Sequence, residues 1–233
     1  MRGRSVLAAG IALFALCDAP KLRSQVTVGT WSFGDCIPFS CLNAGDRYQQ
    51  LYAASAFPGP MTITGLTFFL DPSANPPGSS IQLGPGVFDI YLAISNRPIG
   101  GLTTNLDFNV SSGEQLFFAA GLPSGGMSTS FTIFGDPFVY NPALGNLLLE
   151  VVASQTSVGG SFLKAGANET DTESATCSTP FGGLGGGCVA GAGQSALVTQ
   201  FVTTPEPQTL WLVGTGLVLA AAYSRRSKHS RRS

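Results

Sequence analysis

Apolar and polar side chains alternate along the middle of this chain with the two-residue period of β-strands. The clearest segment is 87–95, whose even positions are all large and apolar and form the predicted core face. Residues 61–70 change from one apolar face to the other at Gly65, which predicts a β-bulge there. Further strands are predicted at 26–33, 47–53, 114–119, 128–134, 146–153 and 196–202, with 137–141 as a short edge strand.

The connections between these segments are rich in glycine, proline, serine and asparagine, and no amphipathic helix separates them. About nine or ten short strands in such a setting predict one all-β domain, a β-sandwich or jelly roll, over residues 25–204. Residues 71–86 and the glycine run 182–188 are predicted surface loops. Glu150 interrupts an apolar run and is predicted to point outward.

The N-terminus has the pattern of a secretory signal. Arg2 and Arg4 precede an uncharged apolar run at 6–16, which is too short to span a membrane. Cleavage is predicted after Ser24, so that residues 1–24 form a signal peptide. Cleavage five residues earlier would leave a proline after the cut, and the nearby cysteine lacks the small preceding residue of a lipoprotein signal.

The C-terminus carries an uncharged apolar run of 14 residues, 210–223, followed by five basic residues within 225–233. A membrane span needs about 20 apolar residues, and uncharged flanks extend this run to 208–224, a short helix that snorkelling arginines help to seat. A buried helix of a soluble domain is the alternative, but it has no need of a basic flank. Positive residues stay cytoplasmic, which places the body on the other side of the membrane. The predicted membrane helix includes Leu210, Trp211, Leu212, Val213, Leu217, Val218, Leu219 and Tyr223, and the basic stop consists of Arg225, Arg226 and Lys228.

Pro205, Glu206 and Pro207 stand just before this helix. The order of PEP tripeptide, short apolar helix and arginine-rich terminus resembles the PEP-CTERM sorting signal of Gram-negative bacteria, over residues 205–233. The resemblance implies that an exosortase, a membrane protease-transpeptidase, recognises and processes this signal. It also implies a link to exopolysaccharide and biofilm production. Residues 63–150 are similar to β-sandwich domains often found ahead of this signal.

Most of the positive charge lies in the two ends, and the body between them is acidic. Residues 25–204 contain eleven acidic residues but only Arg47, Arg97 and Lys164 as basic ones, a net charge of −8. Such a body repels nucleic acid, so we expect no nucleic-acid partner. The charge suits solubility or weak binding of divalent cations.

Four cysteines remain in the body, as the local pairs Cys36 with Cys41 and Cys177 with Cys188. In an exported protein an even set predicts disulfides. Three pairings are possible, and the two local pairs are the simplest. A zinc site is the alternative, but the spacings match no zinc-ligand pattern and the only histidine, His229, lies in the tail.

The body offers no base for a Ser-His or Cys-His mechanism, because it has no histidine. Two carboxylates alone can hydrolyse a glycoside, but the acids are scattered, mostly in predicted loops where we expect them to be solvated. Glu169, Asp171 and Glu173 could meet a calcium ion, although they lack EF-hand spacing. We therefore predict no catalytic residue, no cofactor and no metal site.

Four aromatic residues of the predicted strands, Trp31, Tyr48, Tyr52 and Tyr91, could stack on sugars if exposed, or fill half-buried positions. The favoured hypothesis is a non-enzymatic exported protein of the cell envelope or extracellular matrix, held in the inner membrane facing the periplasm before processing. Its domain would be structural or adhesive. Its partners would be an exosortase-type enzyme, the membrane and, as a candidate, extracellular polysaccharide. A carbohydrate-binding or carbohydrate-cleaving module is the alternative.

Overall fold

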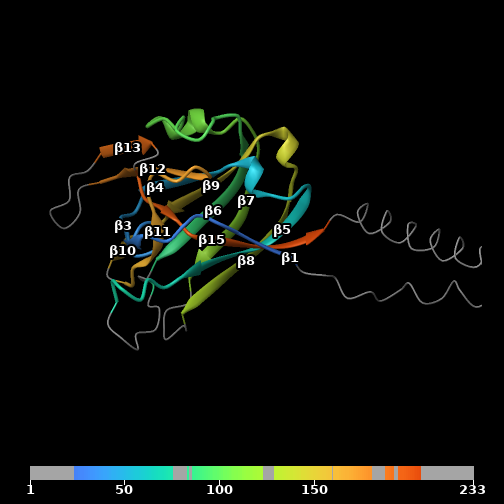
Figure 1. Ribbon diagram of the computed structural model, residues 1–233. Helices are drawn as coiled ribbons and strands as arrows, with labels where there is room; N and C mark the ends of the chain where they lie inside the picture. Colours follow the sequence, from blue (N-terminus) through green and yellow to red (C-terminus); the bar gives the residue numbers. More distant parts are fainter. Residues whose placement is uncertain are drawn as a thin grey trace, which may run out of the picture.

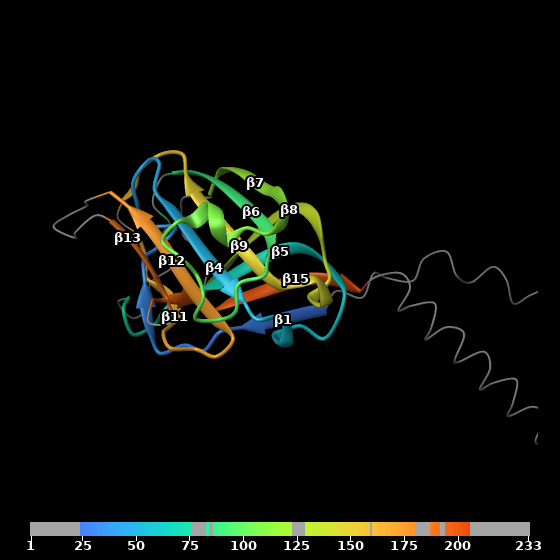
Figure 2. The same cartoon turned by 90° about the horizontal axis from the view of Figure 1, so that it is seen from above.

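Two antiparallel sheets form the body of the protein in the computed structural model, which describes residues 24–75, 83, 86–122, 129–158, 160–179, 187–191 and 194–205. The six-stranded sheet has the order β13 (Gly187–Gly191), β12 (Thr172–Ser178), β4 (Arg47–Tyr52), β9 (Asn146–Ala153), β6 (Val87–Ser95) and β7 (Ser112–Gly121). The four-stranded sheet has the order β1 (Ser24–Val28), β15 (Thr199–Pro205), β5 (Met61–Phe69) and β8 (Ser130–Tyr140). Figures 1 and 2 show this sheet lying across one face of the six-stranded sheet. The predicted all-β, sandwich-like class is confirmed.

Smaller elements close one end of the two sheets. A three-stranded ladder has the order β14 (Ala196–Leu197), β11 (Leu163–Gly166) and β2 (Phe33–Asp35), and β10 (Ser157–Val158) pairs with β3 (Cys41–Leu42). Three short 3₁₀ turns complete the described elements: η1 (Ala54–Ala56), η2 (Leu106–Asn109) and η3 (Pro142–Leu144). The η2 segment lies over the outer face of the six-stranded sheet (Figure 1).

Aromatic side chains from both sheets fill the space between them. The ring of Phe39 lies 4.9 Å from that of Phe68 in β5 and 5.6 Å from that of Phe88 in β6. Tyr52 of β4 meets Phe201 of β15 edge to face at 4.9 Å. Each such pair contributes about 0.5–1.5 kcal/mol beyond the apolar area that it buries. These contacts hold the two sheets together face to face.

The predicted bulge in β5 is confirmed, one residue before Gly65. In the pairing of β5 with β15, Val202 is opposite Gly65 and Thr203 is opposite Ile63, so Thr64 is the extra residue. The bulge reverses the alternation of the strand. As a result Ile63 and Leu66, which a regular strand would place on opposite faces, are both fully buried. The predicted core face of β6 is also confirmed, because its four large apolar side chains are buried.

Several strand boundaries differ from the prediction. The segment 26–33 is interrupted because Gly29, with φ +95°, turns the chain out of β1 before β2 begins. Residues 137–141 are no separate strand, since Pro137 lies within β8, where an edge strand tolerates proline. The strands β11 and β12 were not predicted. They are rich in small and polar residues and show no alternation of large apolar side chains.

The prediction that Glu150 points to solvent is wrong. The η2 segment covers that face of β9, and the Glu150 side chain is only 5 % exposed. Its carboxylate accepts from the guanidinium of Arg47 at 2.6 Å and from the amide of Gln49 at 2.7 Å. When a loop covers the outer face of a sheet, polar side chains on that face become buried, although the alternation of polar and apolar residues predicts that they meet water.

The expectation that the loop acids are solvated is also wrong for three of them. Asp46, Asp71 and Glu173 are each at most 2 % exposed. Each accepts hydrogen bonds from backbone N–H groups, as when Asp46 receives those of Asn43 at 2.8 Å and Thr179 at 2.7 Å. A buried charge is tolerated only where donors surround it. The donors here are N–H groups of loops, so these carboxylates hold loops against the strands.

Both predicted disulfides are present. Cys36 is joined to Cys41 across the short turn between β2 and β3, and Cys177 is joined to Cys188 across the β12–β13 pair. Disulfides persist in oxidising compartments. The location is therefore oxidising and non-cytoplasmic.

The predicted signal peptide and C-terminal sorting signal lie outside the described residues, apart from Ser24 and Pro205. Ser24 begins β1. Pro205, which was assigned to the sorting signal, is the last residue of β15 and pairs with Met61. The β domain therefore extends one residue beyond its predicted end. No helix among the residues placed by the structure is long and apolar enough to cross a membrane.

Candidate functional site

One exposed aromatic cluster lies at the end of the sandwich where β2 meets β11. We call it the Trp31 surface and define it by Trp31, Phe162 and Lys164. Trp31 is 42 % exposed and Phe162 is 40 % exposed. Large apolar side chains that gather on a surface with a charged group are more informative than exposed ones that occur singly.

Local backbone geometry places Trp31 there. The positive φ of Gly29 turns the chain away from β1, and the N–H of Ser32 then donates to the carbonyl of Ala165 at 2.9 Å. This bond holds the Trp31 segment against β11. The ammonium of Lys164 lies 4.6 Å from the centre of the indole ring, within the range of a cation–π contact.

Asp71 supports this surface from below. Its N–H donates to the carbonyl of Phe162 at 3.0 Å, and Ser73 donates both its N–H and its O–H to the carboxylate at 2.7 Å. Burial alone would raise the pKa of Asp71, but the donors of Ser73, with the Trp31 indole acting in the same direction, hold that pKa below its ordinary value. The carboxylate is therefore charged under the surface.

Gly34 permits this packing. It pairs with Lys164 in the β2–β11 ladder. A Cβ at this position would lie 2.5 Å from Asp71 Oδ2 and 3.0 Å from the Cβ of Phe162. Any larger residue would separate Asp71 from the strand, so a glycine is required by close approach rather than by its dihedral angles.

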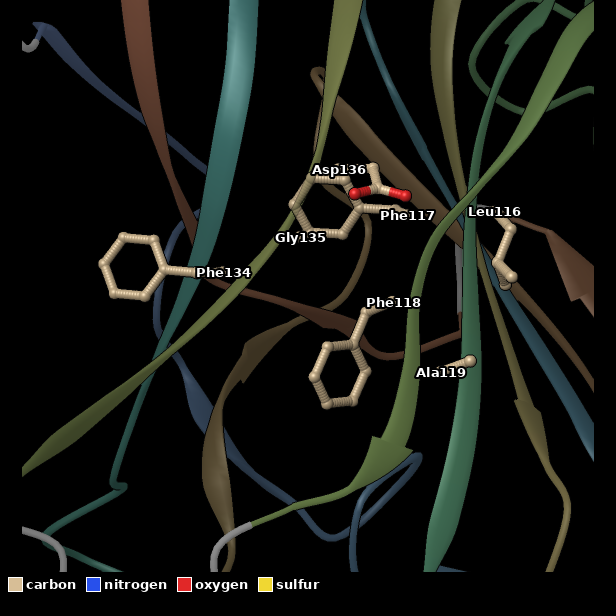
Figure 3. A pocket seen from close by; sticks show the side chains of 7 residues that line it. All are labelled: Leu116, Phe117, Phe118, Ala119, Phe134, Gly135 and Asp136. Atoms are coloured by element: carbon tan, nitrogen blue, oxygen red, sulfur yellow. The ribbon is translucent and has the colours of Figure 1, made fainter.

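A groove between the edge strands β7 and β8 is the second candidate (Figure 3). It has a volume of about 370 Å³ and is lined by Leu116, Phe117, Phe118, Ala119, Phe134, Gly135 and Asp136. Figure 3 shows Phe118 between the two strands, whereas Phe134 turns away from it. The lining is apolar except for one carboxylate, so the groove has no pair of groups for acid–base chemistry.

The two edge strands approach each other closely at Gly135. A Cβ there would lie 2.1 Å from the carbonyl oxygen of Phe117. Gln115 reaches across the groove and donates to the carbonyl of Pro137 at 3.2 Å. The groove is thus a seam at which the edge of one sheet packs against the edge of the other.

The acids that could have met a calcium ion do not converge. Glu173 is fully buried and accepts the backbone N–H groups of Gly100, Gly101 and Leu102 at 2.7, 3.1 and 3.0 Å. Across the part of the chain that the structure describes, no group of three or more potential ligands could hold a metal ion. Glu173 instead anchors a loop.

The structure separates the four aromatic residues that were considered for sugar stacking. Tyr48 and Tyr52 are almost completely inaccessible, at 1 % and 0 % exposed, and neither can meet a ligand. Burial raises the pKa of both phenols. Tyr91 is half-buried in β6. Trp31 is the most exposed of the four.

Sequence reasoning missed Phe162, Lys164 and Asp71 as neighbours of Trp31. Phe162 and Lys164 are two residues apart, which in a strand places them on one face. That signal was usable only once β11 was recognised as a strand. The contact with Asp71 is a long-range one that no local pattern contains.

The sorting residues predicted from the sequence cannot be placed beside these surfaces, because Glu206, Pro207, the helix and the basic stop lie outside the described residues. In comparisons with known proteins, no family model, no curated protein and no solved structure matches this chain.

Proposed function

We propose that this chain is a non-enzymatic exported protein of the cell envelope or extracellular matrix, sorted through Pro205, Glu206 and Pro207. An exosortase-type enzyme processes the signal, and the β-sandwich then serves as a structural or adhesive module associated with exopolysaccharide. The proposal combines the C-terminal resemblance with the geometry of the domain.

The observation that carries it is the pairing of the first and last strands. Ser24, at the predicted cleavage site, pairs with Thr203, two residues before the proposed sorting motif, in the β1–β15 ladder. The same ladder ends at Val28 and Thr199. Figures 1 and 2 show the outer ends of β1 and β15 at one end of the sandwich. A domain tethered there presents its opposite end to the surroundings.

The use of the buried acids supports a structural role. Asp46, Glu150 and Glu173 all accept hydrogen bonds within the fold. All three are also buried, and a general acid or base must come within hydrogen-bond reach of the substrate. The two disulfides support a role outside the cytoplasm, where disulfides persist. They stabilise the domain by restricting its unfolded state.

The intact mass of the protein recovered from a host with an exosortase tests the sorting proposal. We expect a mature chain that begins near Gln25 and has lost the segment beyond the PEP motif. Glu206→Ala should leave the tail attached, whereas Glu114→Ala, which changes an exposed acid of β7, should be processed normally. A mature chain that still ends at Ser233 in that host would rule the proposal out.

A carbohydrate-binding module is the second candidate, and the exposure of Trp31 favours it. Binding of the exported protein to an array of polysaccharides tests this candidate. Failure to bind any polysaccharide would leave the domain a purely structural module.

A further inference from the structure

We propose that the Trp31 surface binds an acidic polysaccharide. A pyranose ring would lie on the accessible part of Trp31, and a uronate carboxylate of the same chain would pair with the ammonium of Lys164. This inference rests on the proposed function, because it names the ligand of an adhesive module linked to exopolysaccharide.

Trp31 is held in place although it is exposed. The bond from Ser32 to Ala165 fixes its backbone, and Lys164 lies against its ring. Beneath it, Asp71 is held by Ser73. An aromatic residue that is already ordered loses little conformational entropy when a ligand binds. The C–H groups on one face of a pyranose form an apolar surface, and covering it with an indole removes both from water.

Lys164 supplies the charge that selects an acidic ligand. Among the described residues the salt bridges are those of Arg47 with Asp107 and Glu150, and Lys164 takes part in none. This is unexpected in a body that has eleven acids and three basic residues. The ammonium carries three donors, and a charge-assisted bond to a carboxylate is the strongest that it can form.

The position of the surface fits a ligand outside the cell. Trp31 follows Val28, which lies at the far end of β1 from Ser24. Phe162 and Asp71 are near the end of β5, where Leu70 bridges to Leu163. Ser24 and Pro205, the described residues next to the two ends of the chain, lie at the other end of β1 and β15. A tether at that end therefore directs the Trp31 surface away from the membrane.

The β7–β8 groove is a weaker candidate. Its lining side chains are apolar apart from Asp136, but nothing in the structure indicates what would fill it. The Trp31 surface combines an ordered aromatic ring with a cation, and these two groups together specify the chemistry of one ligand.

Affinity electrophoresis of the exported protein, purified as the cell delivers it, tests the inference. The gels contain polygalacturonate, a polyuronate, or dextran, a neutral glucan. At an ionic strength of about 0.15 M the Debye length is about 8 Å, which screens repulsion from the acidic body but retains direct contacts. We expect polygalacturonate to retard the protein and dextran to retard it far less.

Two variants and one control identify the site. Trp31→Ala should weaken retardation by polygalacturonate about tenfold or more, which corresponds to about 1.4 kcal/mol. Lys164→Gln should weaken it several-fold, and Lys164→Arg should restore it. Phe108→Ala removes a side chain that is 67 % exposed on η2 and should change nothing.

Thermal unfolding shows whether each variant is folded, and Lys164→Gln removes only a partly exposed charge, so that it tests the site even if Trp31→Ala unfolds. Equal retardation of wild type and Lys164→Gln would overturn the inference, as would equal binding of dextran and polygalacturonate or no binding at all. The intact mass of the same preparation reports separately on sorting. Normal processing without polyuronate binding would reject this inference alone.

Discussion

The carboxylate of Glu173 lies 2.7 Å from the backbone nitrogen of Gly100, although 73 positions separate the two residues. The same carboxylate accepts the N–H groups of Gly101 and Leu102. One buried acid of β12 thus anchors the loop that precedes η2 and covers the outer face of the six-stranded sheet. The sequence predicted Glu173 to be a solvated loop acid, but it is buried in β12 and holds this loop in place.

Replacing Glu173 should therefore destabilise the domain. Glu173→Ala leaves the N–H groups of Gly100 and Leu102 without an acceptor, whereas Gly101 keeps the carbonyl of Pro98. Each unsatisfied buried donor costs about 1–3 kcal/mol, part of which water recovers at the loop edge. We expect the free energy of unfolding to fall by about 2–4 kcal/mol in urea titrations. Amide hydrogen exchange at Gly100 and Leu102 should accelerate. Glu114→Ala, which removes an exposed acid, is the control. A similarly small change in the free energy of unfolding of both variants would contradict a stabilising role of Glu173.

Arg47 pairs with two carboxylates in different surroundings, and these should differ in energetic weight. Glu150 is 5 % exposed and Asp107 is 75 % exposed at the side chain. Glu150→Leu should lower the free energy of unfolding by about 3 kcal/mol, because Arg47 and Gln49 lose a buried acceptor. Asp107→Asn should change it by less than about 1 kcal/mol, since solvent screens an exposed pair. Equal losses in urea titrations would show that burial does not separate the two.

The pH dependence of stability should reflect Asp35. Burial raises the pKa of this carboxyl above its ordinary value of 3.8, although Ser195 and the backbone N–H groups of Ile37 and Cys36 oppose the shift. The folded state then holds the proton more tightly than the unfolded state. Its contribution to stability is present below the ordinary pKa and is lost as pH rises through the raised value.

Asp35→Asn should therefore become more stable relative to wild type as pH rises from about 3 to about 7. Asp71→Asn should show the opposite trend, because the lowered pKa of Asp71 makes its charge stabilising above the ordinary pKa and that stability is lost on acidification. Urea titrations across this range measure both differences. A flat difference for Asp35→Asn would mean that its carboxyl is not perturbed by the fold.

The seam between β7 and β8 should be intolerant of a side chain at Gly135. A Cβ there would meet the carbonyl oxygen of Phe117 at 2.1 Å and its ring at 2.6 Å. Gly135→Ala should destabilise the domain by about 1–3 kcal/mol, the usual cost of overpacking. Gly121→Ala is a matched control in β7, since its Cβ would lie 3.6 Å from the nearest atom. Equal melting temperatures for the two variants would contradict close packing at the seam.

Sequence patterns predicted the strands in which large apolar residues alternate. The segment 87–95 became β6 with the expected core face, and the change of face at Gly65 correctly indicated a bulge. The strand β12 escaped because Thr172, Ser174 and Thr176 are buried polar residues. Hydrophobic alternation detects only strands that bury apolar side chains against a core.

The sequence by itself determined the class of the fold and favoured the local disulfide pairs among three possible pairings. Alternation and turn residues act over a few positions, and each cysteine has its partner within eleven residues. It also contains the C-terminal pattern on which the sorting hypothesis depends.

Only the tertiary structure decided which acids are buried and which aromatic residues are exposed. Whether Glu150 meets water depends on η2, which lies more than forty positions away in the chain. Whether Trp31 meets Lys164 depends on the pairing of β2 with β11. Such contacts arise when segments that are distant in the sequence pack together. The burial of a side chain therefore depends on the whole fold and cannot be read from a short stretch of sequence.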